Sequence, residues 1–205
     1  AILFSQSKRG GQRYPSIEHI NKELAKSDLN LAAHFCGWYS KEVLEGINFS
    51  LISELPACFK RIQINYNFKH NNQWDINSLM AFAERTPERE FILQYNKSNS
   101  ETLDEQEIIG IPSNVHFLHD GSGGRGTEIK EFQEPFNNIY TGYSGGISTD
   151  NIKTICETLS NMKNPNEVWI DMESGVRTDN EFDLKKVEEI LSVCSNFIGQ
   201  EITNE

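Results

Sequence analysis

Asp120 is the residue whose position best fits acid–base chemistry. It ends the apolar stretch 115–120, VHFLHD, and is followed by the glycine-rich segment 121–126, GSGGRG. A carboxylate at the end of a buried strand is partly desolvated, which raises its pKa and lets it act as a general acid near neutral pH. The alternative is that Asp120 only accepts hydrogen bonds from backbone N–H groups of the following turn.

Two serine–glycine turns further along the chain have the composition of anion sites. They lie in GYSGGISTDNI, residues 142–152, and in DMESGVRTD, residues 171–179. Glycine lets the backbone approach an anion closely, and a helix that begins there presents unpaired N–H groups. Either turn alone also occurs as an ordinary turn, but the pair follows the last two predicted strands, where (β/α)8 barrels hold phosphate. The residues predicted to line this phosphate site are Ser144, Gly145, Gly146, Ser174 and Gly175.

Further polar residues fall at or near the ends of predicted strands, which is where parallel α/β sheets bind ligands. A cation such as Arg13, in the first loop, can hold a carboxylate or phosphate as a bidentate fork. A structural role explains any single one of these residues equally well, because polar side chains commonly fill strand ends. The predicted substrate-binding residues are Arg13, His34, Gln63, Asn65, Gln94 and Asp171.

The cysteines and histidines show no pattern of a metal site or of an activated nucleophile. Cys36 follows a predicted strand, but no partner for nucleophilic catalysis is visible, and a small apolar role is the better interpretation. His116 and His119 lie on opposite faces of their strand, and no carboxylate–histidine cluster indicates zinc. We therefore expect no metal and no cofactor. The absence of CxxC spacing predicts reduced, buried thiols in a reducing, cytoplasmic compartment.

The elements that position these residues alternate between strand-like and helix-like patterns. Short, nearly continuous apolar runs are typical of strands that are buried on both faces. They span residues 1–5, 31–36, 61–66, 91–96, 115–120, 138–144 and 168–173. Helical stripes lie between most of them, and Asp75 is the predicted N-cap of one. The stripes contain Ile17, Ile20 and Leu24; Ile76, Leu79, Met80 and Ala83; Ile152, Ile155, Cys156 and Leu159; and Val187, Ile190, Leu191 and Cys194.

Repeated strand–helix units predict a parallel sheet with right-handed crossovers, within a single domain spanning residues 1–205. Both an open doubly wound sheet and a (β/α)8 barrel fit this pattern. Seven strands are one fewer than a barrel has, and an incomplete barrel exposes two edges. Either the first unit is missing from this chain or the sheet is open. A homodimer or a displaced segment would cover the edges. We expect residues 67–74 to form a polar loop and residues 126–138 to form no long helix.

The charge balance excludes several classes of partner. The 205 residues carry a net charge of −11 and contain no lysine- or arginine-rich block, which argues against binding to nucleic acid or to an anionic membrane surface. We expect no signal peptide, and no apolar run in the sequence is long enough to span a bilayer. An acidic protein can still hold a small anion through local backbone N–H groups and a few cations.

Four motifs, in order along the chain, resemble those of phosphoribosylanthranilate isomerase, a family of ribulose-phosphate-binding barrels. ILFSQSKRGGQRYPS resembles the second strand and its loop, and HFLHDGSGGRGT resembles the sixth strand with its catalytic aspartate. GYSGGISTDNI and VWIDMESGVRTD are similar to the seventh- and eighth-strand motifs, and these two are the most specific. The resemblance implies a (β/α)8-type barrel of which this chain shows seven βα units, the first being missing or truncated.

The resemblance also implies roles for individual residues. Asp120 would be the general acid, the two serine–glycine turns would bind phosphate, and Arg13 would approach the carboxylate-bearing ring of the substrate. Asp171 would lie at the rim of the eighth strand. The family's general base is a first-strand cysteine, which this chain does not contain. The fourth-strand histidine is replaced within QINYN, and Arg177 stands where glutamate is common.

These features predict an isomerase-like barrel protein that acts on, or binds, a phosphorylated small molecule of the sugar-phosphate type. Whether it is an enzyme is left open, with an intramolecular oxidoreductase as the expected type. One alternative is a phosphate-binding relative without isomerase activity. Another is a non-catalytic interaction protein with the same fold.

Overall fold

The computed structural model describes most of the chain, and it divides into two compact units, residues 1–117 (unit 1) and 118–205 (unit 2). We describe each unit by itself. The described residues are 1–8, 10–11, 13–26, 28–65, 75–96, 110–121, 132–135, 139–162 and 167–198. The predicted loop 67–74 lies outside them, as do residues 122–126 of the glycine-rich segment and most of 126–138.

Seven strands follow one another in the sheet in sequence order. The pairs β1–β2, β2–β3, β3–β4 and β6–β7 run parallel, as the alternation of strands and helices predicts. The strands are β1 (Ile2–Phe4), β2 (Leu31–Phe35), β3 (Phe59–Ile64), β4 (Glu90–Tyr95), β5 (Val115–Asp120), β6 (Thr141–Ser144) and β7 (Val168–Asp171). Each lies on or close to one of the predicted apolar runs.

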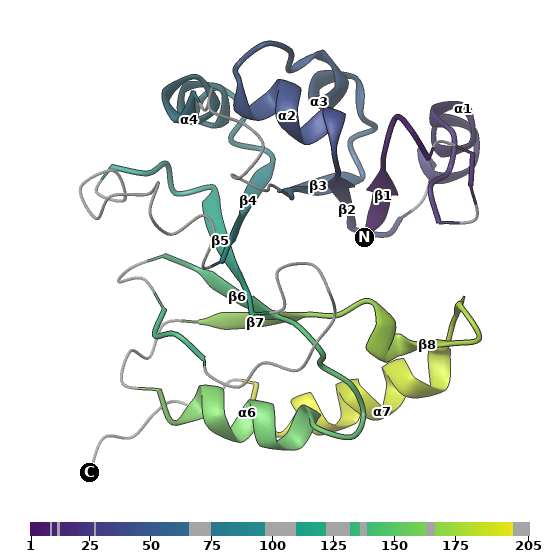
Figure 1. Ribbon diagram of the computed structural model, residues 1–205, viewed down its shortest axis with the longest axis vertical. Coiled ribbons are helices and arrows are strands. Elements are labelled where there is room, and N and C mark those ends of the chain that lie inside the picture. Colours follow the sequence, from purple (N-terminus) through teal and green to yellow (C-terminus); the bar gives the residue numbers. More distant parts are fainter. Residues whose placement is uncertain are drawn as a thin grey trace. The chain divides into compact units, whose positions relative to one another are not determined.

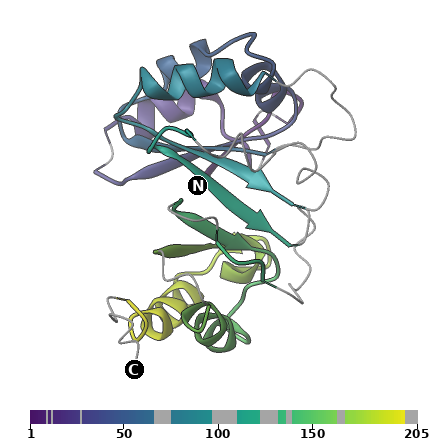
Figure 2. The same ribbon diagram turned by 90° about the vertical axis from the view of Figure 1, so that its left-hand side faces the viewer.

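In unit 1, helices lie along one face of the strands (Figures 1 and 2). They are α1 (Ile17–His19), which continues as the π-helical η1 (Ile20–Leu24), then α2 (Trp38–Leu44), α3 (Ser50–Glu54) and α4 (Ile76–Glu84). The predicted cap of α4 is confirmed, because the Asp75 carboxylate accepts hydrogen bonds from the N–H and the hydroxyl of Ser78 at 3.0 and 2.7 Å. The sequence analysis assigns no helical stripe to residues 36–61, where the structure has α2 and α3. Both are short, and neither shows the long stripe on which the prediction depends.

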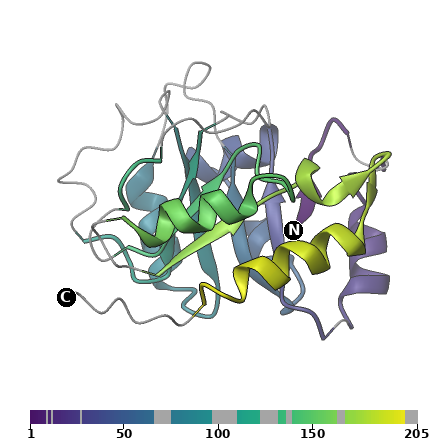
Figure 3. The ribbon, with the colours of Figure 1, turned by 90° about the horizontal axis from the view of Figure 1, so that it is seen from below.

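In unit 2, α6 (Ile152–Ser160) and α7 (Leu184–Cys194) lie side by side on one face of β6 and β7 (Figures 1 and 3). The predicted stripe of α6 is confirmed, because its four residues are the buried residues of that helix. The stripe of α7 is wrong at Leu191, which is 61% exposed, whereas Ile190 is 3% exposed. Val187, Val193 and Cys194 pack against the same core as Ile190, so the buried face of α7 is centred away from position 191.

A tight hairpin precedes α7. Strands β8 (Arg177–Thr178) and β9 (Glu181–Phe182) are antiparallel, and Asp179 and Asn180 between them have φ values of 52° and 66°. A two-residue turn with two positive φ values suits the twist of a hairpin, and Asp and Asn tolerate that conformation. The carboxylate of Asp183 then caps α7 by accepting from the N–H groups of Lys185 and Lys186. No helix in the described part of the chain is long and apolar enough to cross a membrane.

Candidate functional site

Asp120 lies at the carboxyl end of β5, beside the end of β6. The N–H of Gly121 donates a 3.2 Å hydrogen bond to the carbonyl of Ser144, so the two strand ends are adjacent. Asp120 is only 6% exposed. Asp120 is therefore sheltered from solvent at this strand end.

The neighbouring residue, His119, shows which face of the sheet Asp120 occupies. The His119 ring stacks on the Tyr143 ring, with centroids 5.4 Å apart and planes 16° apart. Tyr143 belongs to the apolar cluster that also contains Ile152 and Ile155 of α6. Because successive strand residues point to opposite faces, Asp120 and Ser144 point away from this helix-covered face.

Asp171 shares that second face. Ser144 and Asp171 are register partners on β6 and β7, so their side chains project to the same side of the sheet. Three polar groups from three consecutive strands, Asp120, Ser144 and Asp171, therefore project from one face at the carboxyl ends of β5, β6 and β7. We call this set the unit 2 face.

Two aromatic rings, Tyr140 and Trp169, lie on the same face toward the amino ends of β6 and β7. Gly142 and Trp169 are register partners, and a Cβ atom placed on Gly142 would come within 2.2 Å of the Trp169 indole. Only glycine leaves room for the ring here. The indole also contacts the ring of Tyr140, with centroids 4.5 Å apart. Sequence reasoning missed this arrangement, because neither residue stands out until the register is known.

Burial sets the protonation of the groups behind the face. Desolvation lowers the pKa of His119 to about 4, against a smaller opposing effect of Gln133, so the imidazole is neutral at neutral pH. Burial also raises the pKa of Tyr143, whose hydroxyl donates a 2.7 Å hydrogen bond to the carbonyl of Gln133. Neither ring is a proton carrier near neutral pH, and both support β5 and β6 from the helix side.

The turn after β6 has the backbone that its glycines predict. Gly145 and Gly146 have φ values of 121° and 60°, a region that residues with a side chain rarely adopt. The side-chain amide of Asn151 donates to the carbonyl of Gly146, and its oxygen accepts from the N–H of Ser148, both at 2.9 Å. Asn151 therefore fixes the turn against the first residue of α6, a role that the sequence analysis did not assign to it.

The start of α6 offers fewer unpaired N–H groups than the sequence suggests. The carbonyl of Ser148 accepts from the N–H groups of Asn151 and Ile152, and its hydroxyl accepts from the N–H of Asp150. With the N–H of Ser148 bound to Asn151, four N–H groups around the helix start have protein acceptors. An anion bound here would be held mainly by the glycine turn and not by the end of the helix.

The two predicted phosphate turns touch. Ser174 and Gly175 lie in η4 (Ser174–Val176), a short 3-10 turn directly after β7. A Cβ atom placed on Gly175 would lie 1.9 Å from the carbonyl oxygen of Ile147, so the backbones of the two turns are in direct contact. The contact joins the two chain segments in which the five predicted phosphate-site residues lie.

The candidate residues of unit 1 form a second group. His34 and Gln63 are register partners, and Asn65 lies two positions after Gln63 on the same face, with a 3.3 Å hydrogen bond between the two amides. Gln63 also pairs with Ile92, which places Gln94, two positions further, on this face. Arg13 is exposed in the loop after β1. Apart from Arg13, the group consists of uncharged amides and one histidine.

Cys36 and the possible metal-ligating side chains complete the description of the site. Burial raises the pKa of the Cys36 thiol, against a smaller lowering by Lys8, so it stays protonated at neutral pH. Among the residues that the structure describes, no cluster of three or more His, Cys, Asp or Glu side chains could hold a metal ion. The guanidinium of Arg177 donates to the carbonyl of Asn180, which engages it within the β8–β9 hairpin.

Comparisons with known proteins identify the fold. No model of a protein family matches the chain, and no match was found among curated proteins. Among solved structures, the chain is similar to N-(5'-phosphoribosyl)anthranilate isomerase from Pyrococcus furiosus, with a TM-score of 0.56 and 14% sequence identity. The match covers 95% of this chain and 86% of that one. At this identity the likeness shows the fold alone. The predicted fold class, a (β/α)8-type barrel with seven βα units in this sequence, is confirmed.

Proposed function

We propose that unit 2 binds the phosphate group of a phosphorylated small molecule, of the sugar-phosphate type, at the turns that contain Gly145-Gly146 and Ser174-Gly175. The observation that carries the proposal is the backbone contact between Gly175 and Ile147. In this contact, the glycine-containing turns that follow the neighbouring strands β6 and β7 lie against each other. Ligands of barrel folds bind at the carboxyl ends of the strands, where such turns lie. Glycine N–H groups and the Ser174 hydroxyl are suitable donors to a phosphate oxygen.

We further propose that the protein is an isomerase-like enzyme in which Asp120 is the general acid. Asp120 is buried and lies on the same face as Ser144. Ser144 directly precedes the Gly145-Gly146 turn. A ligand anchored at the turns would extend its non-phosphate part over this face. The acid would then protonate an atom of the substrate from which a bond is breaking. The structural neighbour is by name an isomerase of phosphoribosylanthranilate, so that compound is the first substrate to assay.

Phosphate binding is tested by titrating ribose 5-phosphate into the chain in a calorimeter. Gly146→Ala and Gly37→Ala are a matched pair, because both glycines have a φ of 60° and only Gly146 lies at the proposed site. A Cβ atom on Gly37 meets no atom within 4 Å, so its variant reports backbone strain alone. We expect Ser174→Ala, which removes a hydroxyl donor to a charged group, to weaken binding about tenfold or more. Gly146→Ala should weaken it similarly, because alanine strains the positive-φ backbone that directs the N–H groups of the turn, and Gly37→Ala should leave binding unchanged. Equal affinities in all four proteins would refute the proposed site.

Catalysis is tested separately with Asp120→Asn, using Asp179→Asn, an exposed carboxylate in the β8–β9 turn, as the control. If Asp120 is the acid, its replacement lowers kcat about 10²-fold or more while ribose 5-phosphate still binds. Turnover unchanged in Asp120→Asn would refute the assignment of the acid. Phosphate binding without isomerisation of phosphoribosylanthranilate would instead indicate a binding protein, or an enzyme with another substrate.

A further inference from the structure

Two cysteines from different helices face each other in the core of unit 2. The sulfur atoms of Cys156, in the middle of α6, and Cys194, the last residue of α7, lie 3.9 Å apart, although the residues are 38 positions apart in sequence. Both contribute to the apolar cluster beneath β6 and β7. Both are thiols in this structure, and one donates a weak hydrogen bond to the other.

We propose that Cys156 and Cys194 form a reversible disulfide when the protein meets a low-molecular-weight disulfide, and that this bond ties α6 to the end of α7. A disulfide has an S–S distance of about 2.0 Å, so the two sulfur atoms must approach by roughly 2 Å. Rotation about the side-chain bonds, together with a small shift of the last turn of α7, can supply this. The inference does not depend on the proposed function.

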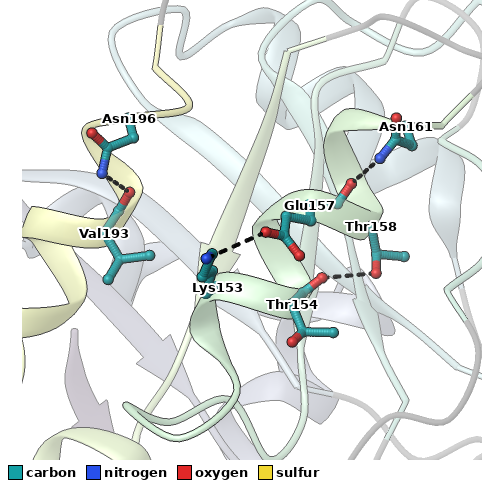
Figure 4. A network of polar contacts seen from close by, with 7 residues as sticks. All are labelled: Lys153, Thr154, Glu157, Thr158, Asn161, Val193 and Asn196. Carbon is teal, nitrogen blue, oxygen red and sulfur yellow. Dashed lines mark hydrogen bonds and ion pairs between the residues drawn. The ribbon is translucent and has the colours of Figure 1, made fainter.

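The surroundings of the pair allow such a shift. The last turn of α7 ends at Cys194, and beyond it the side-chain amide of Asn196 donates to the carbonyl of Val193 (Figure 4). The polar contacts of α6 near the pair lie along its own helix, such as the Ser160 hydroxyl on the carbonyl of Cys156 at 2.8 Å and Lys153 with Glu157 at 3.9 Å. Helix ends open at low free energy, and none of these contacts ties α7 to α6. The pair can therefore close without a buried polar network being broken.

The difference in burial between the two cysteines sets the order of events. Cys156 is 7% exposed, whereas Cys194 is half-buried. Burial raises the pKa of Cys156 to about 12, with Cys194 and Glu157 adding to the effect. The thiolate of Cys194 therefore attacks one sulfur of the small disulfide RSSR first. It forms a protein–SR mixed disulfide and releases RS⁻, which takes up the proton that Cys194 lost.

The second step closes the bond. Cys156 loses its proton and attacks the Cys194 sulfur of the mixed disulfide, the S–SR bond breaks, and a second RS⁻ leaves with that proton. In total two protein thiols are oxidised by two electrons and one RSSR is reduced to two RSH. A small dithiol reverses the reaction. The bond encloses β7, the Ser174–Gly175 turn and α7 in one covalent loop, which restricts the unfolded chain.

The other two cysteines provide the internal control. The thiol of Cys58 donates to the carbonyl of Leu24 at 3.4 Å, and that of Cys36 points to the carbonyl of His34 at 4.0 Å. Both lie in unit 1, and neither has another cysteine as its contact. Oxidation should therefore produce one intramolecular disulfide and leave Cys36 and Cys58 as thiols.

The test treats the folded full chain with glutathione disulfide, alkylates the remaining thiols with iodoacetamide in denaturant and measures the intact mass. We expect the alkylated thiols to fall from four to two, without retained glutathione, and a peptide map to contain a Cys156–Cys194 cross-link. Oxidation should raise the Tm by about 5–10 °C, and a dithiol should reverse the rise. Cys194→Ser should abolish both changes, and Cys36→Ser should retain them.

Two results would overturn the proposal. One is a stable mixed disulfide with glutathione on Cys194 that never resolves. The other is four thiols that remain open to alkylation after prolonged oxidation. Because Cys156 is buried and its variant could fold poorly, the wild-type peptide map and Cys194→Ser decide the matter without it.

Discussion

Replacement of Gly175 by alanine tests the contact that joins the two candidate phosphate turns. The new Cβ atom would lie 1.9 Å from the carbonyl oxygen of Ile147, and real Cβ atoms essentially never approach another heavy atom within 3.0 Å. The two backbones must therefore separate by about 1 Å or more. Gly175 does not have a positive φ, so the effect is a collision and not a strained conformation.

We expect Gly175→Ala to lower the free energy of unfolding by about 3 kcal/mol or more. This value is at the upper end of the range of about 1–3 kcal/mol that is typical when extra atoms are inserted into a packed structure. For a chain of this size that corresponds to a fall in Tm of about 6–12 °C. Urea denaturation of the wild type and the variant, followed by circular dichroism, measures the difference. Ribose 5-phosphate affinity should fall as well, because the turns no longer meet.

Gly142→Ala is the matched control. Its Cβ atom also collides, but with the Trp169 side chain, which can rotate or be trimmed. Replacing Trp169 by valine should therefore recover part of the stability that Gly142→Ala loses, whereas no side-chain change recovers Gly175→Ala. A Gly175→Ala variant whose stability lies within about 0.5 kcal/mol of the wild type, the range of a surface substitution, would refute the contact.

Further predictions concern the core of unit 2. The pKa of His119 lies near 4 in the folded chain, below its ordinary value of about 6.5. Between these two values the unfolded state binds more protons, so the free energy of unfolding decreases as the pH is lowered through that window. At pH 5 the loss is about 2 kcal/mol relative to neutral pH. His119→Phe, which keeps a ring on Tyr143, should remove this part of the pH dependence in urea titrations, and an unchanged profile would contradict the assignment. Ile190→Ala should destabilise by about 2–4 kcal/mol and Leu191→Ala by less than about 0.5 kcal/mol. Equal effects of these two substitutions on Tm would contradict the burial pattern of α7.

Local patterns predicted the elements well. Asp75 was identifiable as a cap because a carboxylate before an apolar stripe satisfies N–H groups within its own helix. The bounds of β5 match the predicted run 115–120, and the four buried residues of α6 match its stripe. These signals lie within a few residues of the structure they determine, so one sequence suffices to read them.

Features that depend on packing between distant segments were not predictable. Leu191 belongs to the same helical stripe as Ile190 in sequence, and only the position of β6 and β7 decides which of the two is buried. The predicted strand 168–173 ends early, at Asp171, because the chain turns into η4 to place Gly175 against Ile147. The role of Asn151 likewise depends on the carbonyl of Gly146, which the turn directs toward it.

The residues of the candidate site come from the sequence, and the structure changes which groups we propose as donors to an anion. The serine–glycine pairs were identified by composition, and the fold brings them together. The sequence assigned the donors to a helix start, but Ser148 and Asn151 already satisfy N–H groups there. This leaves the glycine turns as the donors that we propose, a conclusion that required the hydrogen bonds of the folded chain.

Backbone amide NMR during a titration with ribose 5-phosphate tests the proposed phosphate site most directly. The account predicts that the ¹H–¹⁵N signals of Gly145, Gly146 and Gly175 shift most, with a common dissociation constant, while that of Gly110, a positive-φ glycine before β5, stays in place. Shifts centred on residues outside the two turns, or no shift at saturating ligand, would contradict it.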